Sequence, residues 1–280
     1  MKSILKTFLV GSAICLSANF VQAQALMPQP SSGQTIIQDF GLGKITLNYS
    51  RPNVKDRAIF GDLVPYNQVW RTGANGATSI TFTDDVSFGG KPVKAGTYAI
   101  FSIPTQSEWT VILSKNAQQW GSYTYNQADD VARVTVKPTA LAQKVESFTM
   151  AFANVSAGAL DLVLSWDKTQ VSVPLSVDFD AKVMANIEKA MAGDKKPYFQ
   201  AAQYYYTNNK DIKQALAWVN EADKTSDKAP WVKLWKARIQ LKAGDKKGAK
   251  QSATEGLSIA KELNNGEYVK LNQEFLNGLK

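Results

Sequence analysis

The sequence contains no histidine in its 280 residues, and this absence excludes several classes of active site. A Ser-His-Asp or Cys-His relay needs an imidazole as its general base, and the usual zinc and copper sites need histidine ligands. Catalysis would have to rely on carboxylates, Lys, Tyr, Ser or Arg. The composition therefore predicts no catalytic residue of a common relay, no metal site and no cofactor.

Cysteine is almost absent as well, and the single residue of this type, Cys15, lies in an apolar run, Phe8–Val21. Lysines precede the run and the small Ala23 follows it, which is typical of an export signal. The run is shorter than the ~20 apolar residues of a membrane span, and an uncleaved anchor is the alternative. We predict a signal peptide at residues 1–23 and an exported protein, periplasmic or associated with the outer membrane. Its mature chain would contain no disulfide bond and no thiol nucleophile.

Residues 24–178 have no net charge, because they carry 12 Lys and Arg and 12 Asp and Glu. Residues 179–280 carry 18 Lys and Arg against 12 Asp and Glu, a net charge of +6. A solvated helical surface would explain this basic region, whereas the sharper interpretation is attraction to an anionic partner. The expected partners are an anionic glycan, peptidoglycan, a membrane surface or an acidic protein, and no nucleic acid is expected.

The first of these regions alternates between apolar and polar residues with a period of two, which is typical of β-strands. A long insertion without strand patterning, Arg51–Gly76, interrupts the segments. Turns are expected at Phe88–Gly96, Ile103–Glu108, Ser156–Gly158 and Asp167–Thr169. The pattern predicts an antiparallel β-sandwich, jelly-roll-like, or a barrel over residues 24–178. The expected strands are Lys44–Ser50, Ala77–Thr83, Gly96–Ile103, Glu108–Ser114, Val131–Pro138, Glu146–Val155, Ala159–Asp167 and Gln170–Phe179.

The period then changes to 3.6, which predicts helices over residues 179–280. Two helix pairs align with each other at a spacing of 34 residues, so that Asp211 falls on Asp245 and Ala215 on Ala249. Small residues at such positions allow antiparallel helices to approach closely. The spacing resembles that of a tetratricopeptide repeat, although two units are fewer than a free-standing solenoid needs. We expect a tetratricopeptide-like helical-hairpin domain that offers a docking surface to a protein partner.

The insertion at residues 51–76 is the strongest candidate for a ligand site. Arginine side chains suit carboxylate, phosphate or sulfate groups, and a tryptophan face suits a sugar ring or a cation. One interpretation is a pocket bordered by arginines. The alternative is that the arginines pair internally, for instance with Asp56 and Asp62, and fix a long loop over the sheet while Trp70 fills the core. The candidate ligand-binding residues are Arg51, Asn53, Arg57, Trp70, Arg71 and Asn75.

A tight turn leads from this insertion into the next strand. Gly73, Asn75 and Gly76 are expected to supply the positive φ angles that such a turn needs. The Gly-x-x-Gly spacing is not a phosphate-binding motif, because a strand follows it and not a helix.

A second aromatic patch, at residues 119–130, is a candidate saccharide site, and a packed hairpin end with exposed acids is the alternative. The acidic pairs Asp84-Asp85 and Asp129-Asp130 offer carboxylates for acid–base catalysis or for calcium. Neighbours in a strand point to opposite faces, so such a pair does not make a site by itself. The aromatic residues of this patch are Trp120, Tyr123 and Tyr125.

Four long stretches of the first region carry a family resemblance. They are SRPNVKDRAIFGDLVPYNQVWRTGANGATSITF at residues 50–82, VKAGTYAIFSIP at 93–104, EWTVILSKNAQQWGSY at 108–123 and ARVTVKP at 132–138. They resemble a bacterial family of exported proteins, domain of unknown function 2911, common in the Bacteroidetes group. The resemblance implies an exported β-rich domain without established activity, followed in some members by tetratricopeptide-like repeats. In the family pattern Glu often follows the Trp-Arg-Thr-Gly-Ala-Asn run, where this chain has Gly76, and the departure favours binding or structure over catalysis.

These features together predict an exported envelope protein without enzymatic activity. It would bind a ligand or act as a scaffold through the Arg- and Trp-lined site and a basic helical surface. The alternative is a histidine-free hydrolase or lyase that acts on an envelope polymer, with Asp or Glu as acid–base groups and Arg57 and Arg71 as anion stabilisers. That alternative requires a carboxylate within hydrogen-bond reach of the arginines, inside a cleft. A purely structural role in assembly is the third hypothesis.

Overall fold

The structure, a computed structural model, describes residues 27–279, so the predicted signal peptide at residues 1–23 lies outside the described residues. The chain divides between residues 177 and 178 into two compact units, which we call the β unit and the helical unit and describe separately. The strands of the β unit are β1 (Ser32–Phe40), β2 (Gly43–Arg51), β3 (Thr78–Phe82), β4 (Val86–Phe88), β5 (Lys91–Val93), β6 (Gly96–Pro104), β7 (Trp109–Ser114), β8 (Asp130–Val136), β9 (Thr139–Ala153) and β10 (Ala159–Ser176), with a short 3₁₀ helix at Gln127–Asp129. The helices of the helical unit are α1 (Asp180–Met191), α2 (Tyr198–Thr207), α3 (Ile212–Thr225), α4 (Pro230–Lys242), α5 (Lys246–Glu262) and α6 (Gly266–Gly278).

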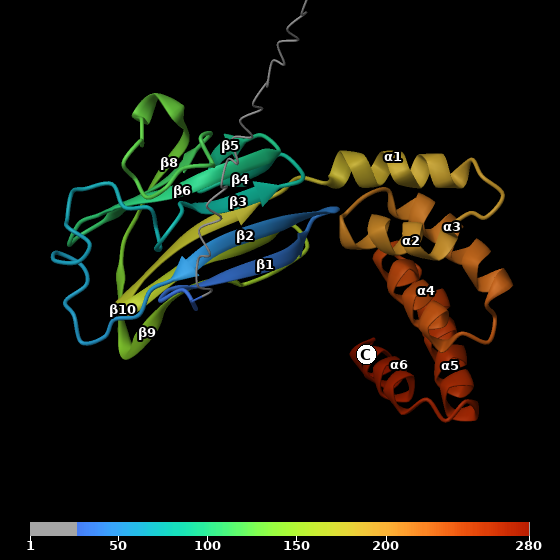
Figure 1. Cartoon of the computed structure of the whole chain (residues 1–280). Coiled ribbons are helices and arrows are strands. Elements are labelled where there is room, and N and C mark those ends of the chain that lie inside the picture. The colour runs from blue at the N-terminus through green and yellow to red at the C-terminus, as the bar shows by residue number, and fades with distance from the viewer. Residues whose placement is uncertain (1–26, 280) are drawn as a thin grey trace, which may run out of the picture. The chain divides into compact units, whose positions relative to one another are not determined.

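The β unit is built from two antiparallel sheets, whose strands can be followed in Figure 1. The larger sheet has the strand order β1-β2-β3-β6-β7-β8, and the smaller has the order β5-β4-β10-β9. The hairpin of β4 and β5 leaves the larger sheet after β3 and pairs with β10. Tyr49 of β2 packs edge-on against Phe148 of β9, with ring centroids 5.9 Å apart, so the sheets share one core. The predicted antiparallel sandwich is confirmed.

The core follows from the alternation of side chains along the strands. On β10, the side chains of Leu160, Leu162, Leu164 and Trp166 are buried, and those between them are partly exposed. The central strands β6 and β7 are buried almost along their whole length. Loop residues cover one face of these two strands, because Val69, Ala77 and Tyr125 pack on a buried cluster of Ala99, Phe101 and Ile112. The insertion before β3 is therefore part of the packed structure.

Two expectations about the strands are wrong. The predicted turn at Asp167–Thr169 is absent, because β10 continues through it as one strand paired with β9. A break in register next to Asp167, whose φ is +51°, absorbs the irregularity as a bulge. The predicted turn at Phe88–Gly96 contains β5, which pairs with β4 as a hairpin. The predicted strands from Lys44–Ser50 to Val131–Pro138 correspond to β2, β3, β6, β7 and β8, whereas β1 was not predicted.

The helical unit places the aligned residues in equivalent positions. Asp211 caps the start of α3 by accepting from the backbone N–H groups of Lys213 and Gln214, and Asp245 caps the start of α5 by accepting from that of Gly248. Ala215 and Ala249 are fully buried one turn further along. The two N-terminal caps and the two small buried residues therefore recur at the predicted spacing.

Close helix packing in this unit depends on a glycine of α5. A Cβ atom on Gly256 would lie 2.6 Å from Oδ1 of Asn272 on α6 and 2.9 Å from Cβ of Lys233 on α4. Only a residue without a side chain fits this distance between three helices. None of the helices within residues 27–279 is long and apolar enough to span a membrane.

Candidate functional site

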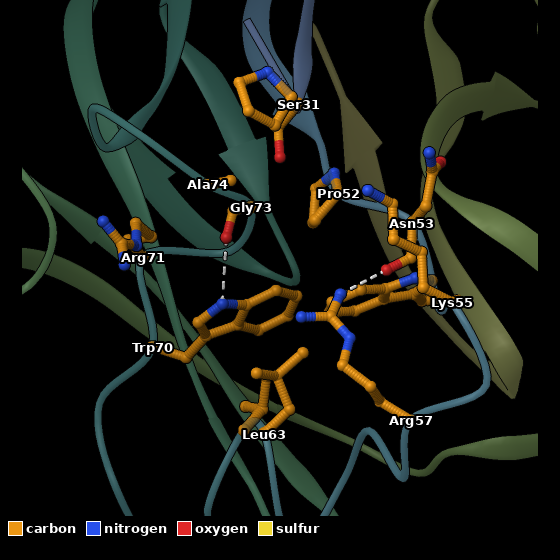
Figure 2. A pocket seen from close by; sticks show the side chains of 13 residues that line it. Ser31, Pro52, Asn53, Lys55, Arg57, Leu63, Trp70, Arg71, Gly73 and Ala74 are labelled. Carbon is orange, nitrogen blue, oxygen red and sulfur yellow. Dashed lines mark hydrogen bonds between the residues drawn. The ribbon is translucent and has the colours of Figure 1, made fainter.

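A pocket of about 310 Å³ opens in the β unit beside the insertion at residues 51–76. Four of the predicted site residues line it, namely Asn53, Arg57, Trp70 and Arg71. They come from two ends of the insertion that the fold brings together (Figure 2). The other residues that line the pocket are Pro30, Ser31, Pro52, Lys55, Leu63, Val64, Gly73, Ala74 and Trp166.

Two indole rings form part of the pocket wall. The rings of Trp70 and Trp166 are nearly parallel, with an interplanar angle of 16° and centroids 5.8 Å apart. Trp166 is buried and Trp70 is partly exposed. Edge-to-face contacts tie Trp70 to Phe60, Trp109 and Phe148. Trp70 therefore anchors the insertion in the core and also presents part of its ring to the pocket.

The orientation of Trp70 is fixed by polar contacts as well. Its Nε1 donates a hydrogen bond to the carbonyl oxygen of Gly73 at 3.1 Å. Its backbone pairs with Ser102 of β6 through an isolated bridge. The indole ring thus has little freedom to move away from the pocket wall.

Three cationic side chains surround this wall, and backbone carbonyls hold two of them. Arg57 donates from Nε to Val54 O at 3.0 Å and from Nη2 to Asn53 O. Figure 2 shows Arg57 reaching toward Trp70. Arg71 donates from Nη1 to Asn75 O at 2.9 Å, and its guanidinium lies on the far side of the pocket from Arg57.

The third cation, Lys55, is exposed. Its backbone N–H donates to Oε1 of Glu146 at 2.9 Å, which fixes the segment that carries it. Within residues 27–279, no carboxylate forms an ion pair with Lys55, Arg57 or Arg71. None of the 13 residues lining the pocket is Asp or Glu. The described wall of the pocket is therefore positive and aromatic.

Two predicted site residues do not line the pocket. Arg51 joins the two sheets, since its Nε donates to Phe148 O at 3.1 Å and its Nη2 to Oγ1 of Thr149 at 2.9 Å. Asn75 acts at the rim, where its side-chain amide donates to Ser31 O and to Ser50 Oγ, both at 3.2 Å. Arg51 thus pairs internally, as the alternative interpretation of the insertion predicted. Its partners are Phe148 and Thr149, however, and not Asp56 or Asp62.

Backbone strain is concentrated around the pocket. Lys55, Asp56, Thr72 and Asn75 have positive φ angles of 47°, 55°, 55° and 60°. Such angles are uncommon outside glycine and are often found at functional sites. The expectation for Gly76 is wrong, because it pairs in extended backbone with Trp120 and has no positive φ. Gly73 and Asn75 have the expected positive φ angles, and the buried Thr72 has one that was not predicted.

The three residues of the second aromatic patch do not lie together on one exposed surface. Trp120 and Tyr123 are exposed, whereas the ring of Tyr125 packs edge-on against Phe101 with centroids 5.1 Å apart. The hydroxyl of Tyr125 donates to Oδ2 of Asp130 at 2.7 Å. Burial and this hydrogen bond to Asp130 raise the pKa of Tyr125 to about 12. Tyr125 is partly buried and packs on the core, so the exposed patch consists of the other two rings.

The acidic pairs have structural partners. Asp129 forms an ion pair with Lys115, Asp130 with Arg133, and Asp85 with Lys94. Among residues 27–279, there is no group of three or more Asp, Glu, His or Cys residues placed to hold a metal ion.

Among the charged and aromatic residues that line the pocket, sequence reasoning did not select Lys55 and Trp166 as site residues. Lys55 lies in the insertion between the predicted site residues Asn53 and Arg57, so its positive charge at that position could have selected it. Trp166 lies far away in sequence on β10, and its inward direction follows from the alternation that buries Leu160, Leu162 and Leu164. Its stacking contact with Trp70 depends on the tertiary fold and could not be read from the sequence.

The fold and site define a class of two-part protein, in which a β-sandwich with a cationic, indole-walled pocket precedes a set of helices. The chain belongs to the family DUF2911, described as "Protein of unknown function", whose model matches residues 31–175. The match spans the insertion and the strands around it and ends before the helical unit. No curated protein and no solved structure matches the chain.

Proposed function

We propose that the β unit binds an anionic ligand with a ring in the pocket beside the insertion, without acting as an enzyme. The observation that supports this is the set of charges: Lys55, Arg57 and Arg71 border the pocket, and no carboxylate lines it. Cations that no carboxylate of the described residues neutralises favour an external anion. The rings of Trp70 and Trp166 provide an apolar face for the ring of the ligand.

The donors of these cations are only partly used. An arginine side chain has five N–H donors and a lysine ammonium has three. Arg57 uses two groups on backbone carbonyls, from Nε and Nη2, which positions the guanidinium and leaves other N–H donors for a ligand. A carboxylate or sulfate that accepts from Arg57 would form charge-assisted hydrogen bonds, which are stronger than neutral ones.

The hydrolase or lyase alternative lacks its acid–base group. It requires an Asp or Glu within hydrogen-bond reach of the arginines, and none lines the pocket. Two carboxylates lie near the insertion outside the pocket lining: Glu146, which accepts from the backbone N–H of Lys55, and Asp56, and both pair with Lys144. Binding without reaction is therefore the function that this geometry favours.

The test is a binding titration of the whole protein with galacturonate and benzoate, which each combine a carboxylate with a ring. Acetate, a carboxylate without a ring, and maltose, which has rings without a carboxylate, serve as comparisons. Tryptophan fluorescence reports binding, since Trp70 and Trp166 line the pocket. We expect galacturonate or benzoate to bind more tightly than acetate and maltose, and to bind less tightly at high ionic strength. Arg57→Ala should weaken that binding at least about tenfold, because it removes charged hydrogen bonds.

The matched control is Lys91→Ala, which removes one exposed positive charge on β5, away from the pocket. It should leave the affinity unchanged. Equal affinities for Arg57→Ala and the unchanged protein, or no binding of either ring-bearing acid, would refute the proposal.

The remaining parts of the proposed function concern export and the helical unit. The sequence before Gln24 supports export to the cell envelope. The recurring caps and small residues of α3 and α5 support a tetratricopeptide-like docking module, and its net charge of +6 supports an acidic protein or anionic envelope surface as partner. Sedimentation with anionic vesicles and with peptidoglycan at low and high salt tests the surface, and an absence of salt-sensitive binding to both would reject it.

A further inference from the structure

Two large aromatic side chains lie exposed on the loop between β7 and the 3₁₀ helix. Trp120 is 67% exposed and Tyr123 is 80% exposed. Large aromatic residues are usually buried in the core or at an interface. Their exposure on the same short loop therefore needs an explanation.

Local contacts hold this loop in one shape. The ring of Tyr123 lies against Gly121, where a Cβ atom would come within 2.7 Å of the ring, and Gly121 has a φ of +66°. Gln119 connects the two sides of the loop, because its Oε1 accepts from Thr124 Oγ1 and its Nε2 donates to Asn116 O, both at 2.9 Å. The two rings are thus presented to solvent on an ordered loop, which lowers the entropy that a ligand must overcome.

The loop is attached directly to the wall of the pocket. Asn75 O accepts both from Nη1 of Arg71, at 2.9 Å, and from the backbone N–H of Gly121, at 3.2 Å. The backbones of Gly76 and Trp120 pair as an antiparallel bridge. A Cβ atom on Gly121 would lie 3.3 Å from Nη1 of Arg71. The pocket wall, Arg71 and the aromatic loop are therefore neighbours on the surface of the β unit.

We propose that the pocket, Arg71 and the aromatic loop form an extended site for an acidic sugar chain. The pocket holds one acidic sugar, Arg71 lies at the transition, and Trp120 and Tyr123 stack on the apolar faces of neighbouring sugars. This inference rests on the proposed function of the pocket and names its ligand as a chain of rings bearing carboxylate or sulfate groups.

The polar composition of the loop favours a sugar chain over a lipid surface. Its other side chains are mostly amides and hydroxyls, namely those of Asn116, Gln118, Gln119, Ser122, Thr124 and Asn126. Amides and hydroxyls both donate and accept hydrogen bonds, as sugar hydroxyls do. Their transfer into hydrocarbon without partners is unfavourable, and the loop offers no aliphatic side chain larger than Ala117 for insertion.

The test compares chain lengths on the whole protein. The probes are galacturonate and tetragalacturonate, and a monosaccharide and a tetrasaccharide derived from heparin, with maltotetraose as the neutral chain. We expect one of the acidic tetrasaccharides to bind at least about tenfold more tightly than its monosaccharide, and maltotetraose to bind weakly. Trp120→Ala and Tyr123→Ala should each remove a several-fold part of the gain on the tetrasaccharide and leave the affinity for the monosaccharide unchanged.

Leu42→Ala is the control, because Leu42 is exposed on the turn at the opposite end of the β1–β2 hairpin from Arg51. Equal affinities for monosaccharide and tetrasaccharide, or an unchanged tetrasaccharide affinity in both aromatic variants, would overturn the extended site alone. If the unchanged protein binds neither the acidic monosaccharides nor the acidic tetrasaccharides, acidic sugars are not the ligand class. The benzoate titration would then decide separately whether the pocket binds anions.

Discussion

At the scale of single residues, Thr72 sets the geometry of the pocket wall. It is fully buried with a φ of +55°, which is rare for a β-branched residue. Its hydroxyl is hydrogen-bonded to the hydroxyl of Ser102 on β6, and its carbonyl accepts from Oγ1 of Thr78 at 2.6 Å. These contacts hold the strained backbone in place. The turn thereby fixes the two residues that precede Thr72: Trp70, whose ring forms part of the pocket wall, and Arg71, which donates to Asn75 O.

The geometry of this turn predicts that alanine substitutions at Gly73 and Gly76 will affect the free energy of unfolding differently. Gly73 has a φ of +149°, and a Cβ atom there would lie 3.0 Å from both Ser50 O and Thr78 Oγ1. Gly73→Ala should therefore lower the free energy of unfolding of the β unit by about 1–3 kcal/mol. Urea unfolding followed by tryptophan fluorescence measures this change.

Gly76→Ala is the matched control for that measurement. Gly76 has no positive φ, and its nearest neighbour to an added Cβ, Gln119 O, is 3.9 Å away. The substitution should be neutral or stabilise by up to ~1 kcal/mol, because it restricts the unfolded chain. Equal destabilisation by the two substitutions would contradict this account of the turn.

The residues of the site were partly predictable from the sequence. The insertion concentrates Arg57, Trp70 and Arg71 within a short stretch, so residue type and spacing were sufficient to select them. Arg51 has the same chemistry, yet its place at the end of β2 directs it to the carbonyl of Phe148. Trp166 could not be selected, because only the pairing of the sheets brings β10 to the insertion.

At the scale of elements, the strands with strong alternation were predictable and the weakly buried ones were not. β1 is mostly exposed or partly exposed, as an edge strand of the larger sheet, and its apolar pattern is correspondingly weak. The polar residues at Asp167–Thr169 are typical of a turn, but pairing with β9 outweighs this local preference. Tertiary pairing therefore decided the places where local patterns failed.

A buried charged cluster lies between helices of the helical unit. Asp223 of α3 forms ion pairs with Lys233 and Lys236 of α4, at 2.9 and 2.8 Å, and Lys233 also pairs with Glu255 of α5 at 3.0 Å. Burial opposes ionisation of Asp223, but the hydrogen bonds from Lys236 and Lys233 outweigh it and lower the pKa of this carboxyl. Its ionised form therefore stabilises the packing of α3 on α4.

This cluster predicts a pH-dependent stability. Because the pKa of Asp223 is lower in the folded state, its contribution is present above the unfolded value of about 3.9 and is lost as the pH falls through the folded value. Asp223→Asn should lower the free energy of unfolding by about 3 kcal/mol at neutral pH, since it leaves the buried Lys233 and the partly exposed Lys236 without this partner. The difference from the unchanged protein should shrink below pH ~4.

Thermal unfolding followed by far-UV circular dichroism, repeated across this pH range, measures the effect on the helices. Asp227→Asn is the control, since Asp227 is exposed and forms no ion pair or side-chain hydrogen bond within residues 27–279. A loss of stability in Asp223→Asn that stays constant between neutral and acidic pH would show that the cluster acts by packing and not by charge.

At the scale of the whole molecule, charge is divided between the two units. Residues 24–178 are neutral overall, so the pocket of the β unit is a local positive region and not part of a basic surface. The helical unit is basic as a whole, with a net charge of +6 over residues 179–280. We therefore expect the two units to attract anions in different ways, the β unit through a shaped pocket and the helical unit through its overall positive field.

The central claim, that the pocket binds an anionic ring, is tested most directly by a crystal structure of the protein with galacturonate. The account predicts a carboxylate within hydrogen-bond distance of the guanidinium of Arg57 and a sugar ring against Trp70 and Trp166. Galacturonate bound elsewhere on the protein, with this pocket empty, would contradict it.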